Sequence, residues 1–396
     1  MESKNIRSAQ FIDTYFPIVD GVVQTVNNYA AEMNATSYSC VVAPKAAEEY
    51  DDSVLPYDVL RSDAVKIPFW EYSYPTPLVD RKLKKELISK KLDIFHAHSP
   101  FTVGTFACSL AKEIGIPVVA TFHSKYYDDC LRITKSKTIA NLVTKKIVKF
   151  FSSVDSVWAV SHGTAETLHS YGYEGDIFVI NNGTNFKVPE NIEELKKEAA
   201  EKYAIPTDKK VILFVGHQIW HKNLKLVLDT FRLLCNKGDE YRLIIVGNGY
   251  NENQIKDYAD KLNFAPGQVS FPGRITDRRL LSGVFACADL FFFPSVYDNA
   301  PLVVREAAAM GVPSLLVAGS NAAETVEKDI SGFTAAEDEK SMLAEIERIF
   351  ADEEMLARVG EAARKTIPVP WSELMPIVYD KYAELIDRKK IELKIK

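Results

Sequence analysis

The sequence predicts an α/β protein built from two Rossmann-like domains that face each other across a cleft. Short β-branched or aromatic runs alternate with longer helical patterns along the chain, which is typical of parallel sheets covered by helices. Several of these runs are almost continuously apolar, as strands buried on both faces are. The chain has 396 residues, of which 47% are hydrophobic and 26% charged, so it is long enough for two domains with sizeable cores.

The expected strands form two series. The first covers residues 9–13, 39–43, 93–97, 117–122, 156–160 and 177–180, and the second covers 210–215, 241–246, 268–271, 290–293 and 314–317. Residues 187–208 contain Pro189, Pro206 and a charged run, which predicts a linker with a short solvated helix. We therefore place the first domain at residues 1–186 and the second at 187–371. A last amphipathic helix, over about 372–396, could pack back on the first domain.

Composition excludes several classes of protein. Lys and Arg number 48 and Asp and Glu 54, so the net charge is −6 and gives no global attraction for nucleic acid. The five cysteines form no CxxC pair, which argues for a reducing cytosol and against a disulfide framework or a cysteine zinc site. Residues 1–10 lack the apolar stretch of a secretory signal, and no run of about 18 apolar residues occurs. We therefore expect a cytoplasmic location.

One strand-to-helix turn carries two carboxylates. Asp298 and Glu306 are separated by seven residues, and Pro301 between them suits the first turn of a helix. The backbone N–H groups before this helix and the positive end of its dipole favour a phosphate, while the carboxylates could hold hydroxyls of a sugar and a ribose. By spacing alone, an Asp298 that caps the helix and a solvated Glu306 are equally compatible.

Three further residues stand where strands or helices begin or end. Lys222 follows a strand and its loop and could neutralise a diphosphate, although a surface lysine at a helix start is the better interpretation of the lysine alone. His123 ends a buried strand and could bind a sugar hydroxyl or serve the structure only. Gly21 opens a helix, where it could let the backbone approach a ligand or simply form a turn.

Two patterns point elsewhere, but weakly. His96 and His98 would lie on one face of a strand, as metal ligands can, yet no third ligand is near in the sequence and a metal is not expected. Gly247 and Gly249 look like the start of a dinucleotide fingerprint whose third glycine is replaced by Glu252. An NAD-dependent oxidoreductase is the rival enzymatic interpretation.

Taken together, these segments resemble the retaining family 4 glycosyltransferases of the GT-B type. The resemblance runs from Phe11 to about Phe333 and includes further blocks in the family's order, at residues 160–164, 180–184, 246–249, 269–273 and 319–324. Residues 11–22, 96–104 and 121–127 look closest to diacylglycerol glucosyltransferases and their relatives. The resemblance implies transfer of a hexose from a nucleotide diphosphate sugar, with a UDP-sugar as the expected donor, and retention of the anomeric configuration. It implies no cofactor and no required metal.

The family's roles carry over onto matching positions. Glu306 matches the carboxylate that holds the nucleotide ribose, Asp298 the one that faces the donor sugar, and Lys222 the diphosphate-binding lysine. His123 matches the histidine near the sugar, and these four residues are the catalytic candidates. Gly21 and a loop match backbone groups that approach the donor phosphates; the loop consists of Asn299, Ala300, Pro301, Leu302 and Val303.

Three departures from the family's pattern matter, one of which is the run Asn-Gly-Thr-Asn at residues 182–185, where the family often has Asn-Gly-Val-Asp. Asp298 replaces a glutamate, which shortens the reach by one methylene, and His217 stands where the family has a phosphate-binding arginine. Histidine is neither permanently charged nor bidentate. The departures therefore leave room for a degenerate, non-catalytic protein that binds sugar nucleotides.

The motifs do not define the acceptor, which could be a membrane glycerolipid or a soluble sugar or polysaccharide precursor. Residues 81–91 carry six cations against one acid, and residues 132–149 carry six cations and no acid. That composition is typical of helices at an anionic lipid surface, so we expect peripheral binding at the inner face of the membrane. The alternative is two solvated helix faces whose apolar residues join the core.

Overall fold

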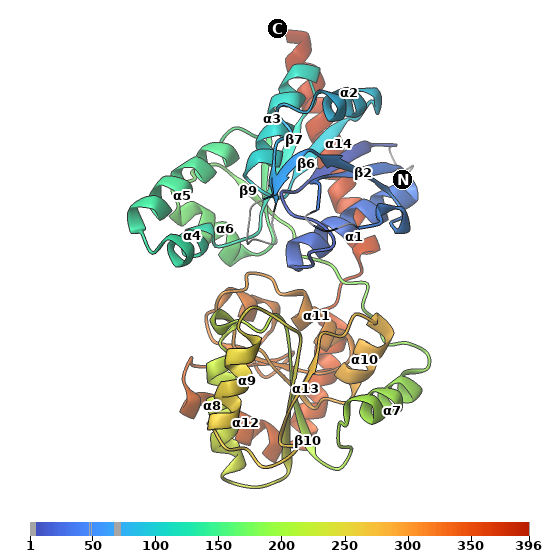
Figure 1. Cartoon of the computed structure of the whole chain (residues 1–396). Coiled ribbons are helices and arrows are strands. Elements are labelled where there is room, and N and C mark those ends of the chain that lie inside the picture. Colours follow the sequence, from blue (N-terminus) through green and yellow to red (C-terminus); the bar gives the residue numbers. More distant parts are fainter. Residues whose placement is uncertain (1–4, 47, 49, 67–72, 396) are drawn as a thin grey trace. The chain divides into compact units, whose positions relative to one another are not determined.

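The computed structural model describes residues 5–46, 48, 50–66 and 73–395, and the chain divides into two compact units (Figure 1). Unit 1 comprises Met1–Gly183 and Trp371–Lys396, and unit 2 comprises Thr184–Pro370. Each unit contains a parallel sheet with helices packed on it. The predicted fold class, two Rossmann-like α/β domains, is therefore confirmed.

The sheet of unit 1 has the strand order β3-β2-β1-β6-β7-β8-β9. Its strands are β1 (Arg7–Phe11), β2 (Tyr38–Pro44), β3 (Asp58–Ser62), β6 (Ile94–Ala97), β7 (Val118–Phe122), β8 (Ser156–Ala159) and β9 (Ile177–Val179), and a separate antiparallel pair is formed by β4 (Ala64–Lys66) and β5 (Ser73–Pro75). Strand numbers fall along the sheet as far as β1 and rise from β6 onward, so the direction in which the sheet is built reverses between β1 and β6. In open α/β sheets, ligands bind beyond the carboxyl ends of the strands at such a reversal.

Helices of unit 1 cover both faces of this sheet, because successive strand residues point to opposite sides. Cys40 and Val42 of β2 belong to a core with Phe95, whereas Val41 and Ala43 pack with the first helix. The helices are α1 (Gly21–Thr36), α2 (Arg81–Ser89), α3 (Thr102–Ile114), α4 (Tyr126–Thr134), α5 (Lys137–Phe151), α6 (His162–Ser170) and α14 (Trp371–Ile395), with a 3-10 turn η1 (Asp52–Val54).

The C-terminal helix α14 belongs to unit 1. Trp371 lies 5.2 Å from Tyr29 of α1 between ring centroids, and Tyr382 lies 5.7 Å from Trp158 of β8. These side chains form one core cluster on one face of the sheet. Hydrophobic burial thus holds α14 in unit 1, although all of unit 2 lies between α14 and the rest of unit 1 in the sequence.

The sheet of unit 2 has the order β12-β11-β10-β13-β14-β15 and reverses between β10 and β13. Its strands are β10 (Lys210–Val215), β11 (Tyr241–Val246), β12 (Val269–Gly273), β13 (Leu290–Phe292), β14 (Ser314–Val317) and β15 (Phe333–Ala335). Its helices are α7 (Ile192–Tyr203), α8 (Leu224–Cys235), α9 (Glu252–Lys261), α10 (Arg278–Ala286), α11 (Leu302–Ala309), α12 (Glu339–Ala351) and α13 (Glu353–Thr366), with 3-10 turns η2 (Trp220–Lys222) and η3 (Asn321–Thr325). The loops after β10 and β13 carry the predicted residues.

Three expectations about the elements were wrong. The first strand ends at Phe11, because the Asp13 carboxylate turns away to accept from Thr102 and from the backbone of Val103 at the start of α3. Helix α7 is not merely solvated, since it buries Leu195 and Ala199. Strands β3 and β15 were missed, because β3 mixes charged with apolar residues and β15 has only three residues.

Candidate active site

An ion pair joins the two strand–helix connections at the reversal point of unit 2. Lys222, the last residue of η2, places its Nζ 2.6 Å from Oδ1 of Asp298, and the two side chains are only 13% and 17% exposed. Ser295 donates its hydroxyl to Oδ2 of the same carboxylate at 2.5 Å. The interpretation of Lys222 as a surface lysine is therefore wrong. So is the alternative that Asp298 caps α11, because Pro301 is the N-cap and makes no capping bond through its side chain.

Glu306 lies inside α11 and is 7% exposed, so it is not a solvated helix residue. Arg278, at the start of α10, donates Nη2 to Glu306 Oε1 at 2.6 Å. The same guanidinium lies 4.7 Å from the centroid of the Phe186 ring. A buried carboxylate is costly unless it is paired, and Arg278 provides that pairing from a half-exposed position.

The loop before α11 presents backbone N–H groups at the positive end of the helix. Asn299 is buried and accepts from Nδ2 of Asn321 at 2.8 Å, which holds the loop against η3. The first-turn amides of a helix have no partners within the helix and favour an anion. With the Lys222 ammonium nearby, this connection can bind a diphosphate, and Asp298 and Glu306 can accept hydrogen bonds from hydroxyls.

Gly247 and Gly249 serve the packing of two loops. Gly247 has φ +131°, and a Cβ there would lie 2.0 Å from the Gly216 carbonyl oxygen; a Cβ at Gly249 would lie 2.6 Å from the Gln218 carbonyl oxygen. The glycine pair thus lets the loop after β11 touch the loop after β10. A close backbone approach accounts for both glycines without a dinucleotide. His217 is exposed in the second of these loops, on the same connection as Lys222.

In unit 1, His123 follows β7 and belongs to a buried histidine cluster. His98 Nδ1 lies 3.1 Å from His123 Nε2, and the rings of His96 and His98 stack with centroids 4.1 Å apart. Burial lowers the pKa of all three imidazoles, that of His123 to about 3. Both ring nitrogens of His96 are engaged, one with Tyr382 and one with Thr121, each at 2.6 Å. In the described part of the chain, no three His, Cys, Asp or Glu side chains gather as metal ligands.

Gly21 is the first residue of α1, directly after the Asp20 N-cap. A Cβ at this position would meet nothing within 4 Å, and the backbone is not in the left-handed region. No turn therefore requires a glycine here, and the open side of its Cα is compatible with close approach of a ligand.

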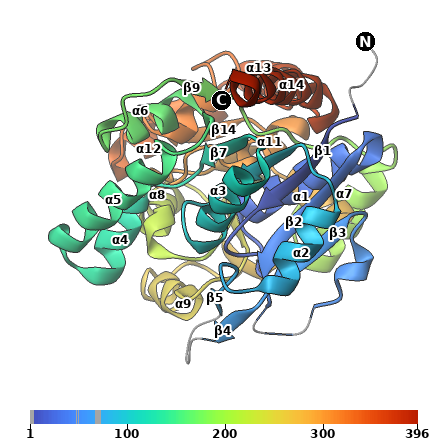
Figure 2. The same cartoon turned by 90° about the horizontal axis from the view of Figure 1, so that it is seen from above.

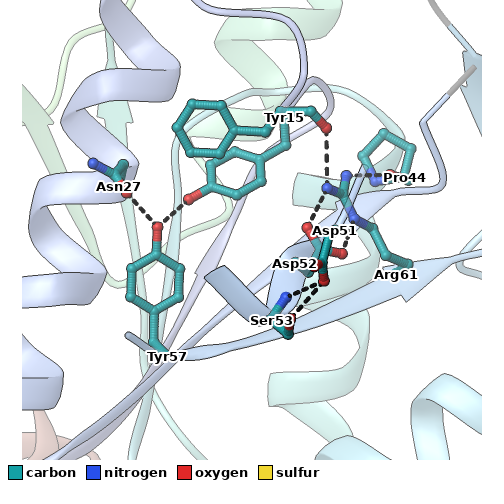
Figure 3. A network of polar contacts seen from close by, with 9 residues as sticks. Tyr15, Asn27, Pro44, Asp51, Asp52, Ser53, Tyr57 and Arg61 are labelled. Carbon is teal, nitrogen blue, oxygen red and sulfur yellow. Dashed lines mark hydrogen bonds and ion pairs between the residues drawn. The ribbon is translucent and has the colours of Figure 1, made fainter. Parts of the chain in front are cut away.

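The loop that leads to Gly21 is held by a polar network (Figure 3). The hydroxyls of Tyr15 and Tyr57 lie 2.6 Å apart, and Tyr57 donates to Asn27 of α1 at 2.5 Å. Arg61 on β3 donates to the Phe16 carbonyl at 3.0 Å while its guanidinium is paired with Asp52. Sequence reasoning missed this network, because its members come from separate loops and strands.

The candidates are divided between the units. His123 and Gly21 belong to unit 1, whereas Lys222 and Glu306 belong to unit 2 together with His217, Asp298 and residues 299–303. The structure brings Lys222 and Asp298 into direct contact. Arg278, which the sequence analysis missed, adds a contact to Glu306; nothing in its sequence context separates it from a surface cation at a helix start.

Two families match the chain. Residues 19–187 match the family described as Glycosyltransferase Family 4, and residues 196–366 match the family described as Glycosyl transferases group 1. The first match ends four residues beyond Gly183, where the first segment of unit 1 ends, and the second match lies within unit 2.

Individual relatives show the same likeness. The chain is 27% identical to an alpha-monoglucosyldiacylglycerol synthase from Streptococcus pneumoniae, covering 78% of this chain and 70% of the relative. It is 23% identical to a GDP-mannose-dependent alpha-mannosyltransferase from Corynebacterium glutamicum, covering 96% and 89%. Its fold is similar to Anabaena HepE, solved in complex with UDP-glucose, with a TM-score of 0.72 at 14% identity over 97% of this chain and 100% of that one.

Proposed function

We propose that this chain, which belongs to the glycosyltransferases through its Family 4 and group 1 domains, transfers a hexose from a UDP-sugar to a membrane glycerolipid. The proposed transfer retains the anomeric configuration. The observation that carries the proposal is the shielded pair of Lys222 and Asp298 beside the N-terminus of α11, with Glu306 inside that helix. This set offers one cation and the positive end of α11 for a diphosphate, and two carboxylates for hydroxyls.

The chemistry fits those groups. The bond between the anomeric carbon and the diphosphate oxygen breaks, and negative charge builds on the leaving diphosphate. In this proposal the Lys222 ammonium and the positive end of α11 stabilise that charge. The acceptor oxygen attacks from the side of the departing phosphate, which takes the acceptor proton. No pair of closely spaced catalytic carboxylates is needed, in contrast to retaining glycosidases.

The proposed donor and acceptor are supported by likeness to relatives. The name of the Streptococcus relative describes synthesis of a glucosyl diacylglycerol, and the HepE structure contains UDP-glucose. The Corynebacterium relative is named for GDP-mannose. UDP-glucose and diacylglycerol are therefore the first substrates to test, with GDP-mannose as the competing donor.

The test is transfer by the full chain. The protein is incubated with UDP-glucose, UDP-galactose or GDP-mannose and with vesicles that contain diacylglycerol, and the released nucleoside diphosphate and the glycolipid are measured. Proton coupling at the anomeric position of the product reports retention. We expect an α-linked hexosyl lipid with a UDP-sugar. Donor binding without hydrolysis or transfer would indicate the non-catalytic alternative, and transfer only to soluble sugars would refute the lipid acceptor.

The structure favours one of the two basic segments as the lipid contact. On α2, Leu83 and Leu87 are buried, and Lys84 and Lys90 near it pair with Glu113 and Asp58. The alternative of a solvated helix whose apolar residues join the core describes this segment well. We therefore place no lipid contact on residues 81–91.

The helices α4 and α5 differ from α2. They lie side by side at the margin of unit 1 in both views (Figures 1 and 2). Ile147 and Phe151 join the core, but Ile133, Ile139 and Leu142 are 62%, 45% and 57% exposed. The lysines at positions 135, 137, 145, 146 and 149 of the same segment are exposed as well. A segment that exposes both apolar side chains and cations is suited to an anionic lipid surface, where each cation contributes about 1 kcal/mol. Among the residues described, no helix combines the length and the apolar character that crossing a membrane requires.

Sedimentation with vesicles of varied anionic lipid content tests this docking. The variant Lys145→Gln/Lys146→Gln/Lys149→Gln should lose binding that rises with anionic lipid and falls with salt. The control Arg81→Gln/Lys82→Gln/Lys85→Gln removes the same charge from exposed positions of α2 and should bind as the wild type does. Equal loss in both variants would indicate net charge rather than a docking surface.

A further inference from the structure

The carboxylate of Glu306 has one oxygen engaged by the protein. Within the described part of the chain, its side-chain partner is Arg278, whose Nη2 donates to Oε1 at 2.6 Å, and no described residue donates to Oε2. We propose that Arg278 is a positioning residue for nucleotide specificity: it holds Glu306 through Oε1 and thereby presents Oε2 to a hydroxyl of the nucleotide ribose. The ribose rests on the proposed function, and both residues belong to unit 2.

Both side chains come from the edge of the sheet at which the strands of unit 2 end. Helix α10 follows β12 and begins with Arg278, while α11 follows β13 and has Glu306 as its fifth residue. The Asp277 carboxylate caps α10 by accepting from two backbone N–H groups, which defines where that helix begins. In open α/β sheets, ligands bind beyond the carboxyl ends of the strands. The pair therefore lies on the side of unit 2 that is suited to a nucleotide.

The Arg278 guanidinium has a second contact, with an aromatic ring. Its Cζ lies over the Phe186 ring, 4.7 Å from the centroid. Phe186 is buried and packs edge-on against Phe285 of α10, with the centroids 5.6 Å apart and the planes at 74°. A guanidinium can lie over an aromatic face and still donate hydrogen bonds from its edge. The ring thus limits the positions from which Nη2 can reach Glu306.

The two members of the pair differ in burial. The Glu306 side chain is 9% exposed, whereas that of Arg278 is 59% exposed. A buried carboxylate is costly unless it is paired, so Glu306 depends on Arg278 for its orientation. Ion pairs with an exposed member contribute little to stability. Removal of the cation should therefore release the carboxylate from its position without unfolding unit 2.

Pairing at Oε1 determines what Glu306 recognises at Oε2. An ionised carboxylate can only accept hydrogen bonds, so Oε2 admits a hydroxyl and excludes a phosphate oxygen. A hydrogen bond to a charged acceptor is stronger than one to a neutral acceptor. A nucleotide that lacks the hydroxyl in question would leave Oε2 without a donor. Arg278 would thus favour ribonucleotides over their deoxy analogues, and it would act only through Glu306.

Isothermal titration of the full chain with UDP, 2′-deoxy-UDP and 3′-deoxy-UDP tests this role. In the wild type, at least one deoxy analogue should bind roughly tenfold or more weakly than UDP, the scale of one lost hydrogen bond to a charged group. Arg278→Met keeps an unbranched side chain but removes the cation. We expect the ratio of the two dissociation constants to fall to about threefold or less in this variant, because most of that hydrogen bond is lost.

Two further variants separate the ion pair from other effects of the substitution. Arg278→Lys keeps a cation within reach of Glu306 but lacks the planar guanidinium, so it should restore most of the ratio. Arg279→Met removes the same charge from the neighbouring exposed position of α10 and should keep the wild-type ratio. Thermal unfolding of each variant verifies that it is folded.

Equal weakening of UDP and both analogues in Arg278→Met, with the ratio unchanged, would refute the positioning role. A ratio that rises would also refute it, since Arg278 would then compete with the ribose for the carboxylate. Equal ratios in the Met and Lys variants would exclude an action through the charge. These results leave the proposed function intact, whereas a wild type that binds no UDP would refute both, so the two failures are distinguishable.

Discussion

Lys222 and Asp298 are 76 positions apart in the sequence, yet their side chains meet at 2.6 Å in a shielded ion pair. The shorter aspartate at this position still reaches the lysine, so the departure from the family's glutamate leaves the two charges in contact. In the proposed function, a diphosphate at the N-terminus of α11 shares the Lys222 ammonium with Asp298. Lys222 is therefore positioned by a carboxylate that also borders the proposed sugar site.

Replacing Lys222 by alanine should reduce transfer by about 10²-fold or more at subsaturating donor, the scale of one preorganised charged group. It also leaves the Asp298 carboxylate without its cation, next to the incoming diphosphate. Steady-state release of nucleoside diphosphate measures the effect. Lys225→Ala is the matched control, because Lys225 is 60% exposed and pairs with Asp229 on the same helix. Activity of the Lys222 variant within twofold of wild type would remove Lys222 from the mechanism.

Glu306→Gln should weaken binding of the nucleoside diphosphate about fivefold. Hydrogen bonds to a charged acceptor contribute roughly 1 kcal/mol more than those to a neutral amide, and about 1.4 kcal/mol corresponds to a factor of ten. Isothermal titration with UDP alone gives the affinity. Glu361→Gln serves as the control, since it likewise loses an ion pair with an arginine, but at the surface. Unchanged affinity would restrict Glu306 to its pairing with Arg278.

Replacing Gly247 or Gly21 by alanine should have different effects, the first on the stability of the fold and the second on donor binding. Gly247→Ala places a Cβ against the Gly216 carbonyl at positive φ, so we expect a loss of about 2–4 kcal/mol in the free energy of unfolding. Gly21→Ala points into open space within an ordinary helical start and should leave the thermal midpoint unchanged while weakening donor binding. A Gly21 variant with wild-type donor affinity would show that no ligand approaches this backbone.

The histidine cluster should make unit 1 sensitive to acid. In the native state His96, His98 and His123 stay neutral, because burial lowers the pKa of each. Unfolded histidines take up protons below about pH 6.5. For His123 the unfolded state therefore binds more protons than the native state between about pH 3 and 6.5, and for His96 and His98 it does so below about pH 6.5. Stability falls as pH falls below 6.5, by up to about 1.4 kcal/mol per pH unit for each histidine.

Urea unfolding at pH 7.5 and pH 5, followed by hydrogen exchange of the β6 and β7 amides, measures this loss. His123→Asn should flatten the pH dependence by about one proton. His169→Gln, an exposed histidine of α6, should leave it unchanged. Equal slopes for wild type and the His123 variant would mean that His123 is protonated in the native state.

Local sequence patterns specify those elements whose environment depends on neighbouring residues. Residues 210–215, 241–246 and 314–317 were predicted as strands with the bounds that the structure has. Their apolar runs report burial on both faces of a parallel sheet, which neighbouring residues do not alter. The spacing of Asp298, Pro301 and Glu306 likewise predicted the strand–loop–helix connection, because turn and helix signals act over a few residues.

Contacts between distant side chains follow from the folded arrangement of the sheets and helices. Three arrangements join residues that are far apart in the sequence. Arg278 pairs with Glu306, and α14 packs in unit 1. His98 lies within hydrogen-bond distance of both Gln10 and His123. Such contacts depend on the strand order and register of the sheets and on the faces that hydrophobic burial brings together. Local periodicity does not specify these pairings. Lys222 therefore resembles a surface lysine in the sequence, although in the fold it forms a shielded ion pair with Asp298.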